Sequence, residues 1–518
     1  MTENKVRFVY PRLQLAYLLQ FAIWGSWCVA LGGYLSGKMS GPHIGALYMA
    51  IPWGAIIAPM FIGPIADRYF SAQKVLGLLH LIGGATLVAC GVICVQAETQ
   101  AAGGAVVVPF ASLMVLMLLS GLCFMPSIPL INTVVFKHIP DSASAPRVFI
   151  FGTVGWIMVN LVVEILAGGA ASPNFFFIGG GCGIFLGLYS FTLPDTPPKG
   201  AVAGAKKDVF GLGALAMFKS PTFTLFVLCA FMVSIFGSNY FFPSVVAYLS
   251  EFGYPAPVAL TTLNQFSELI FMALLPFCVA RFGLKWVLVI GMSAWAVRYF
   301  IFPLPGFQFA LIGLLFHGMA YAFLYVAAYM FADRVAPAHL KASVQSLLAF
   351  LLLGIGQVLS GYLFGYQIDR NAPAITKTVV IQEGKAAKGL PAWNVPEMET
   401  SGWRYLDLAK SVKYLRGDKN IFNFGEHLGS YTKVDGSLDL DKVPDTWESG
   451  GVSYTKAELK ATLDKIGARV TRDDYLRAQR HNWKGFFIPA AVFSLFWVFV
   501  FIAFGKEPVA APAEPARK

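Results

Sequence analysis

The side chains best placed to do chemistry are polar residues that recur at helical spacing inside long apolar segments. One such segment carries four of them at i, i+3, i+4 and i+7, namely Thr261, Asn264, Gln265 and Glu268, which on a helix share one face. A carboxylate at membrane depth is costly unless it faces protein or a water-filled cavity. We therefore predict that Glu268 lines a polar cavity and takes up and releases a proton there. The alternative is a structural Glu268 held by interhelical hydrogen bonds.

Other apolar segments carry polar and aromatic side chains at related spacings. The sets are Gln20, Trp24 and Trp27; Thr153, Trp156, Asn160 and Glu164; Ser238, Asn239 and Tyr240; and His317, Tyr321 and Tyr325. Aromatic residues at helical spacing more often pack in a core or at a membrane interface than bind a ligand. A lone membrane histidine is as often a packing residue as a proton carrier. Glu164 stands toward the end of its segment, where plain solvation is the simpler interpretation.

Together these side chains describe a pocket of amides, hydroxyls and aromatic rings around one carboxylate. Such a lining suits a neutral, hydrogen-bonding solute that carries a ring, so a nucleoside fits and a sugar fits nearly as well. No nucleophile–base pair, zinc-ligand spacing or phosphate loop is visible in the sequence, and we therefore predict no enzyme, metal or cofactor. The predicted substrate-binding residues are Gln20, Trp24, Thr153, Trp156, Asn239, Gln265, Glu268, His317 and Tyr321.

The composition places these segments in a membrane. The 518 residues are 57% hydrophobic and 13% charged, whereas globular chains carry about 25% charged residues. A helix of about 20 apolar residues crosses the hydrocarbon core. Runs of that kind predict twelve spans, centred near residues 23, 55, 84, 118, 158, 183, 235, 269, 293, 319, 354 and 494.

The basic residues indicate the orientation of these spans. When the N-terminus is placed in the cytoplasm, most Lys and Arg outside the long polar segment fall in inner loops and tails, and the short outer loops hold Lys38 and Arg298. This asymmetry is the positive-inside pattern. The net charge of +11 therefore indicates topology and not a nucleic-acid partner, and both termini are expected in the cytoplasm.

The spans divide into two similar halves. A segment rich in Pro, Gly, Ala and Lys, 194–220, separates a first bundle, 1–193, from helices seven to eleven, 221–366. Trp24-Gly25-Ser26 in the first half corresponds to Phe236-Gly237-Ser238 in the second, and repeated halves of this kind enclose a substrate at the membrane midplane. The last predicted helix is 484–505, and a cytoplasmic tail, 506–518, follows it.

The loop after the second span contains Gly63, Asp67 and Arg68, followed by Lys74. This pattern resembles the gating-loop signature of the major facilitator superfamily. The resemblance implies an all-α membrane fold of twelve helices in two pseudo-symmetric bundles. It also implies that Asp67 helps to hold one alternating state closed, whereas an Asp-Arg turn that only anchors the loop is the other interpretation.

Longer stretches resemble the nucleoside:proton symporter family within that superfamily. They are Leu19-Gln-Phe-Ala-Ile-Trp-Gly-Ser-Trp27, Asp67-Arg-Tyr-Phe-Ser-Ala-Gln-Lys-Val-Leu76, Gly152-Thr-Val-Gly-Trp-Ile157, Leu193-Pro-Asp-Thr-Pro-Pro-Lys199, Gln265-Phe-Ser-Glu268, Arg281-Phe-Gly-Leu-Lys285 and His317-Gly-Met-Ala-Tyr321. The similarity covers the spans and implies that the nucleoside is contacted by Thr153, Trp156, Asn239, Gln265 and Glu268.

The chain departs from that family at three positions in the spans. Phe149 stands where the family has an Arg, Ala322 where it has an Asp, and Phe236 where some members have a Gln. Losing a buried base and a buried acid together is electrostatically consistent, because either one alone would be an uncompensated charge. The resemblance implies proton symport, with Phe149 and Ala322 in place of the family's Arg and Asp.

The residues 367–483 form a polar insertion between the last two predicted spans, on the outer side. Mixed charges, the four residues Trp393, Trp403, Trp447 and Trp483, and a helical pattern over 456–480 predict a small folded cap. The sequence assigns the cap no role.

We therefore predict a monomeric, multi-pass carrier of the inner membrane that moves nucleosides and protons by alternating access. Two alternatives stay open. The first is a carrier of the same fold for sugars or sugar-like solutes. The second is a receptor or scaffold that does not transport and acts through its outer insertion.

Overall fold

The computed structural model describes residues 3–58, 70–101, 106–140, 144–197, 212–337, 340–372, 440–449, 452–457 and 480–508. Contacts divide the chain into two compact units. One contains residues 1–369 together with 484–518, and the other contains residues 370–483. The second unit covers nearly the same residues as the predicted insertion.

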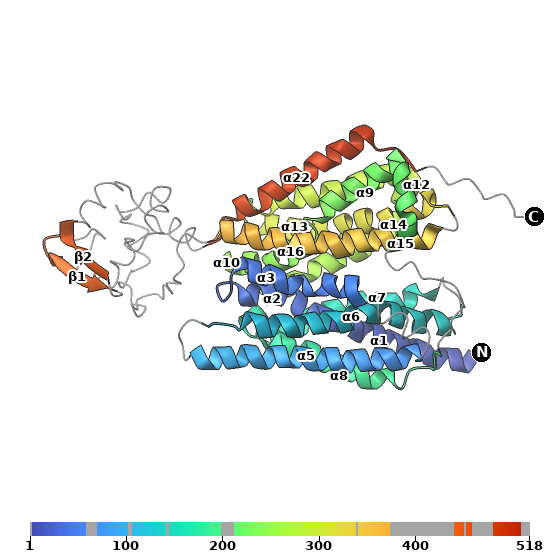
Figure 1. The fold of residues 1–518 in the computed structure, drawn as a ribbon, viewed down its shortest axis with the longest axis horizontal. Helices are drawn as coiled ribbons and strands as arrows, with labels where there is room; N and C mark the ends of the chain where they lie inside the picture. Colours follow the sequence, from blue (N-terminus) through green and yellow to red (C-terminus); the bar gives the residue numbers. More distant parts are fainter. Residues whose placement is uncertain are drawn as a thin grey trace, which may run out of the picture. The chain divides into compact units, whose positions relative to one another are not determined.

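The first half of the large unit contains the helices that Figure 1 colours blue to cyan-green. They are α1 (Glu3–Cys28), α2 (Ala30–Leu35), α3 (Gly41–Tyr48), α5 (Ala72–Ala101), α6 (Phe110–His138), α7 (Pro146–Leu166), the short 3₁₀ turn η2 (Gly169–Ala171) and α8 (Asn174–Ser190). A further helical stretch covers residues 50–58.

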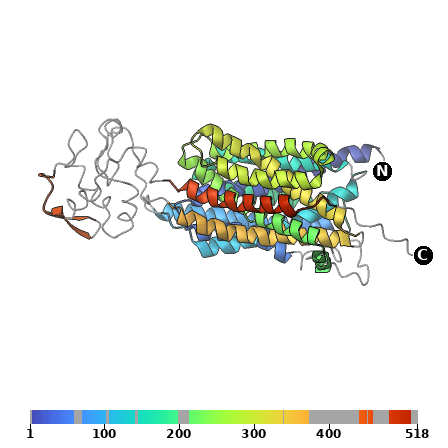
Figure 2. The ribbon, with the colours of Figure 1, turned by 90° about the horizontal axis from the view of Figure 1, so that it is seen from above.

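The second half contains the helices coloured green to red. They are η3 (Leu212–Lys219), α9 (Pro221–Ser234), α10 (Ser238–Glu251), α11 (Pro257–Leu260), α12 (Thr262–Ile301), α13 (Phe307–Tyr321), η4 (Ala322–Val326), α14 (Ala327–Val335), α15 (Lys341–Leu348), η6 (Ala349–Ile355), α16 (Gly356–Arg370) and α22 (Trp483–Phe504). Figure 2 shows the same bundle from above, with its helices running along one common direction.

Nine helices of the described residues are long and apolar enough to cross a membrane. One of them, Pro257–Ile301, bends at Gly283 (φ 81°, ψ 163°), a left-handed conformation that glycine adopts without strain. The bend divides it into two arms, as the predicted centres near 269 and 293 require. All twelve predicted centres fall in or beside described helices, and the count of twelve itself stays a prediction.

The outer faces of these helices are apolar. Side chains such as Val115, Ile165, Phe277 and Phe499 are more than half exposed. Soluble monomers rarely expose so much contiguous apolar surface, whereas a bilayer solvates it. The structure is therefore an all-α membrane bundle of the expected class.

Two helices break near the middle of the bundle. α1 ends at Cys28 and the chain resumes as α2 at Ala30, while α9 and α10 are separated at residues 235–237. The predicted span near residue 235 is thus two helical pieces. Broken helices free backbone groups for a binding site in membrane carriers. π-helical turns, which often occur at functional sites, lie at η4 and η6.

In the second unit the described residues include a two-stranded antiparallel hairpin. It joins β1 (Thr446–Ser449) to β2 (Val452–Thr455), with Trp447 paired to Tyr454. The predicted helical pattern over 456–480, together with Trp393 and Trp403, lies almost entirely outside the described residues.

The two halves meet closely at one end of the bundle. Figure 1 shows that α1 begins and α22 ends at one end, while α16 ends and α22 begins at the other, which we call the α16 end. There α2 packs on α10, and a Cβ at Gly32 would collide with the backbone of Pro243. Likewise a Cβ at Gly45 of α3 would collide with the backbone of Gly361 in α16. Glycine is required for these backbone approaches.

Two carboxylates join the halves at the same end. Glu164, near the end of α7, accepts hydrogen bonds from the backbone N–H groups of Val258 (2.7 Å) and Ala259 (3.1 Å) in α11. Asp369, near the end of α16, accepts one from Gly41, the first residue of α3 (2.7 Å). Each carboxylate binds the positive start of a helix in the other half. Glu164 is therefore a link between halves and not merely a solvated residue.

We predict that replacing both carboxylates, Glu164→Ala with Asp369→Ala, opens the α16 end in a larger fraction of molecules. Hydrogen bonds to a charged group are worth about 1.5–3 kcal/mol each, enough to shift a two-state balance. Spin labels at the exposed positions Val107 and Leu304, one in each half, would report longer distances by pulsed electron resonance.

The matched control is Glu98→Ala. Glu98 pairs with Lys38 at 2.9 Å, and both residues belong to the first half, so its loss should leave the distances between halves unchanged. Unchanged distances in the double variant as well would show that the two caps do not hold this end closed.

Candidate functional site

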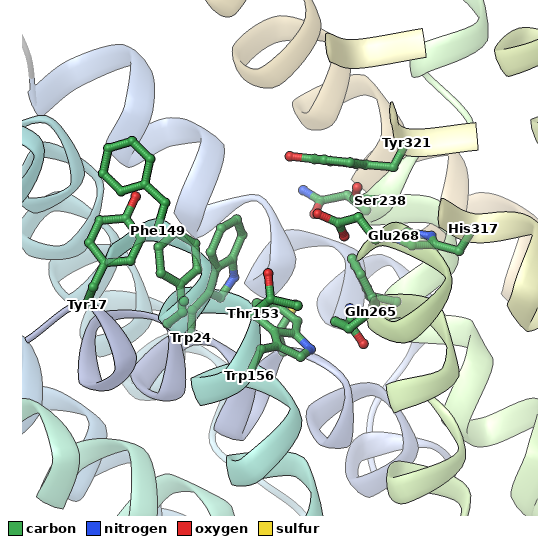
Figure 3. Close-up of a pocket in the computed structure, with 15 residues that line it drawn as sticks. Tyr17, Trp24, Phe149, Thr153, Trp156, Ser238, Gln265, Glu268, His317 and Tyr321 are labelled. Atoms are coloured by element: carbon green, nitrogen blue, oxygen red, sulfur yellow. The ribbon is translucent and has the colours of Figure 1, made fainter. Parts of the chain in front are cut away.

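A cavity of about 250 Å³ lies between the two halves. This volume is close to the lower end of the range of about 300–1000 Å³ for small-molecule sites. Its lining, part of which Figure 3 labels, is Tyr17, Phe21, Trp24, Cys28, Phe149, Gly152, Thr153, Trp156, Ser238, Asn239, Phe242, Gln265, Glu268, His317 and Tyr321.

The lining comes from α1 and α7 of the first half and from α10, α12 and α13 of the second. Figure 3 shows Tyr17, Trp24 and Phe149 on one side, and Gln265, Glu268 and Tyr321 on the other. One wall is therefore mainly aromatic, whereas the facing wall is mainly polar.

The α1 wall differs from the predicted stripe. Tyr17, Phe21, Trp24 and Cys28 line the cavity at i, i+4, i+7 and i+11, which is one helical face. Gln20 and Trp27 lie on other faces and do not line it. The helical spacing of Tyr17, Phe21 and Cys28 with Trp24 could have indicated this face. The polar amide of Gln20 instead led to a prediction centred on the neighbouring face.

Gln20 is fully buried within the first half. Its amide nitrogen donates to Ser127 Oγ (2.7 Å), and its amide oxygen accepts from His80 Nε2 (2.7 Å). Both ends of the amide are thus paired with side chains of α6 and α5. The structure gives Gln20 a packing role away from the cavity.

The α7 wall carries Thr153 and Trp156, both of which the sequence predicts. Trp156 packs edge-to-face on Trp24, with ring centroids 5.5 Å apart, and its Nε1 has no hydrogen-bond partner among the residues described here. Asn160 lies farther along and donates to Trp156 O (2.8 Å). Of the predicted α7 stripe, only Thr153 and Trp156 line the cavity.

Phe149 occupies the position at which the resembling family has an Arg. Its ring stacks on Tyr17 with centroids 4.9 Å apart and contacts Phe136 edge-on at 5.6 Å. An aromatic cluster therefore occupies this part of the cavity wall, where the resemblance implies an Arg in the family.

The break between α9 and α10 positions Asn239. Its side-chain nitrogen donates to Tyr48 O (3.1 Å) and Gln357 O (3.2 Å), and its backbone N–H donates to Gln357 Oε1 (2.9 Å). These bonds leave the amide oxygen of Asn239 as an acceptor for a solute. The neighbouring Ser238 also lines the cavity, whereas Tyr240 turns away and donates to Phe486 O (2.7 Å).

α12 presents Gln265 and Glu268 to the cavity. Within the described residues, Glu268 makes no hydrogen bond and no ion pair, and Gln265 Oε1 has no partner. The helix lies so close to α13 that a Cβ at Gly318 would collide with the backbone of Ser267. Thr261 and Asn264, from the same predicted stripe, are buried and lie outside the lining.

α13 contributes His317 and Tyr321, whose rings stack with centroids 6.1 Å apart. Tyr325, one turn farther, lies outside the lining and approaches Gln357 Nε2 at 3.4 Å. Ala322, where the resembling family has an Asp, is fully buried at the start of the π-helical turn η4. Glu268 is therefore the only carboxylate in the cavity lining of the described chain.

Two predictions concern residues elsewhere. The gating-loop residues Gly63, Asp67 and Arg68 lie outside the described residues. Arg298, expected in a short outer loop, is fully buried inside α12, and that prediction was wrong. The helix continues to Ile301, and aromatic side chains surround the guanidinium, so a basic residue near the end of an apolar run was mistaken for a loop residue.

Comparison with known proteins relates this architecture to membrane carriers. Residues 9–378 match a family described as nucleoside H⁺ symporter. YegT of Escherichia coli strain K12, provisionally named a nucleoside transporter, is 35% identical over 374 residues, which cover 69% of this chain and 84% of YegT. The nucleoside permease NupG of the same organism is 27% identical over 380 residues, covering 69% of this chain and 87% of NupG.

Solved structures agree on the fold. A crystal structure of the nucleoside transporter NupG superposes with a TM-score of 0.65 at 21% identity, covering 96% of this chain and 98% of NupG. The xylose transporter XylE of Escherichia coli, in an inward-open conformation, gives a TM-score of 0.52 at 13% identity over 70% of this chain and 89% of XylE. Because carriers of different solutes share the architecture, the fold alone does not select the solute.

We predict that Gln20→Ala lowers stability and leaves solute binding intact. The change removes the buried partner of His80 and Ser127, and an unpaired buried polar group costs about 1–3 kcal/mol. Thermal unfolding of the purified protein should occur at lower temperature, while uridine affinity should stay within about twofold. Trp24→Ala, on the cavity side of the same helix, is the contrast, because it should weaken binding. Weaker binding in Gln20→Ala with unchanged stability would instead place Gln20 in the binding site.

Proposed function

The chain belongs to the nucleoside H⁺ symporter family, and on that premise we propose that it carries nucleosides together with protons by alternating access. It is a multi-pass protein of the inner membrane and a transporter, as its permease relatives are, and not an enzyme.

The proposed site rests on the Glu268 carboxylate. The Glu268 carboxylate lines a cavity between the two halves and has no partner within the described residues. An unpaired carboxylate is expensive in a membrane bundle, so its retention is best explained by a solute or a proton that pairs with it in the transport cycle.

The facing walls suit the two parts of a nucleoside. The Asn239 oxygen, the Gln265 amide and Glu268 offer hydrogen-bond partners for ribose hydroxyls. The rings of Trp24 and Trp156 offer apolar faces for a base. A solute spanning the cavity would then contact both halves, and its binding would be coupled to their relative motion.

Glu268 is also our candidate proton carrier. A protonated Glu268 is neutral and can donate to the solute, whereas an ionised Glu268 leaves a negative charge in the cavity. Binding of the solute and binding of the proton are therefore linked through one side chain. With Ala322 in place of the family's Asp, no second carboxylate of the described lining shares this role.

The contacts between the halves support a direction of opening. If both termini lie in the cytoplasm, as the basic residues predict, the α16 end is the outer end. The Glu164 and Asp369 caps would then seal the cavity from outside, and the state described here would load or release its solute from the cytoplasm. We further propose that a single chain is the transporting unit, because both walls of the cavity come from one chain.

We predict uptake of uridine and adenosine, but not of xylose, by proteoliposomes that contain the protein. A proton gradient directed inward should raise the accumulation of the nucleosides, because each proton enters with its solute, and a protonophore should abolish that rise. The measurement is retained radiolabel, with protein-free liposomes as the control. Xylose uptake without nucleoside uptake would favour the sugar carrier, and absence of any uptake would favour the scaffold.

We predict that Glu268→Gln abolishes gradient-driven accumulation and leaves the protein folded. Gln has nearly the same shape and keeps hydrogen-bonding groups, but it cannot take up a proton. Uptake should be measured over a range of external pH in wild type and variant, with nucleoside exchange across the membrane as a readout that needs no gradient.

Glu98→Gln is the matched control, because it removes one carboxylate at the bundle end and none from the cavity. It should retain the pH dependence of the wild type. If Glu268→Gln also retained the wild-type pH dependence, Glu268 would not be the proton carrier.

A further inference from the structure

Arg298 is a buried cation without a carboxylate partner in the described part of the chain. It is fully buried in α12, and its Cζ lies 3.7 Å from the ring centroid of Phe241 and 4.9 Å from that of Trp295. Aromatic faces stabilise a guanidinium in such a position. Its Nε and Nη2 atoms have no hydrogen-bond partner among the described residues, so the charge is placed here at a cost.

The one side chain that Arg298 contacts by a hydrogen bond is His317. Arg298 Nη1 lies 3.0 Å from His317 Nδ1. A guanidinium has only donors and no acceptor, so Nδ1 must accept and cannot carry a proton. The imidazole proton is therefore on Nε2. A second proton on Nδ1 would face the guanidinium N–H directly, so the ring is neutral in this arrangement.

The His317 ring is also fixed in orientation. It stacks with Phe241, the ring that Arg298 also contacts, at 6.0 Å and with Tyr321 at 6.1 Å. His317 lines the cavity, whereas Arg298 does not. His317 Nε2 makes no hydrogen bond to the described residues. It is also absent from the buried polar atoms that lack a partner, so it is accessible from the cavity. The edge of the ring opposite Arg298 is therefore the one available to a solute.

We propose that Arg298 is a positioning residue that holds His317 as a neutral donor, and that His317 Nε2–H binds an acceptor oxygen of the transported solute. The identity of that solute rests on the function proposed above. The pairing itself rests only on the geometry of Arg298 and His317.

The neighbourhood of His317 suggests why a fixed donor is useful. Figure 3 shows His317 on the same side of the cavity as Glu268 and Tyr321. A solute hydroxyl could donate to the Glu268 carboxylate and accept from His317, or a carbonyl of the base could accept from His317 alone. Of the titratable and charged groups around the ring, Arg298, Tyr321 and Glu268, only Glu268 is then left to carry the transported proton.

The tautomer can be tested without any solute. In full-length protein labelled with ¹⁵N-histidine, the signal of His317, one of seven histidines, should show protonated Nε2 and unprotonated Nδ1 across the pH range of transport. The signal is assigned by its loss in His317→Gln. Arg298→Met should release this fixed state, because the tautomer is then set by solvent and neighbours, whereas Arg298→Lys should restore it through another donor.

Signals of His317 that are unchanged in a folded Arg298→Met protein would overturn the positioning role. A His317 that becomes doubly protonated in the wild type within the working pH range would overturn it as well. A merely structural Arg298 would lower the melting temperature without moving the tautomer signals.

The donor is tested by binding of uridine, 2′-deoxyuridine and 3′-deoxyuridine to wild type and His317→Phe. Loss of a buried hydrogen bond should weaken uridine binding on the order of tenfold. If a ribose hydroxyl is the acceptor, the deoxy analogue that lacks it should lose little further affinity in the variant. Equal further losses for both analogues would point to the base carbonyl.

Uridine affinity unchanged by His317→Phe would overturn the donor role. If the wild type bound none of these nucleosides but showed the fixed tautomer, the proposed solute would be wrong and the Arg298 pairing would stand.

Discussion

The cost of an unpaired polar group in a lipid-solvated bundle organises this protein. Inside the halves, many buried polar side chains have partners on other helices, as Gln20 does with His80 and Ser127. Hydrocarbon outside the bundle leaves no other source of hydrogen bonds. Some buried groups outside the cavity also lack a partner in the described chain, such as the Asn264 amide and Arg298 Nε, so a missing partner marks the site only where the side chain also lines the cavity. Glu268 and the oxygen of Gln265 lack partners in the described chain, and both face the cavity.

The same constraint shapes the contact between the halves. At the α16 end, Glu164 and Asp369 each bind backbone N–H groups at the start of a helix in the opposite half, and these groups lack partners within their own helix. Each cap uses one carboxylate, Glu164 from the first half and Asp369 from the second, in a reciprocal arrangement suited to a duplicated fold. Water could solvate both partners, so on the proposed function these bonds would hold a closed state without making it permanent.

Sequence reasoning predicted the membrane bundle and most of the α7, α10, α12 and α13 lining, because polar residues are rare enough in apolar segments to stand out. It failed where the signal depended on partners. The phase of α1 could not be fixed, since Gln20 looks like a ligand residue until its bonds to other helices are known. Arg298 looked like a loop residue because a sequence does not show the aromatic rings that surround a guanidinium.

The structure shows what surrounds the two positions, Phe149 and Ala322, at which the resemblance implies an Arg and an Asp in the family. An Arg in place of Phe149 would meet the rings of Tyr17 and Phe136, and an Asp in place of Ala322 would be fully buried in the π-helical turn. Each of these buried charges would be costly unless the other charge or water compensated it. With both absent, the described cavity lining holds no Arg or Lys to favour an ionised Glu268, which suits the proton carrier proposed above. On the pairing proposed above, Arg298 holds His317 neutral, so the cavity keeps a hydrogen-bond donor while proton exchange is left to the Glu268 carboxylate.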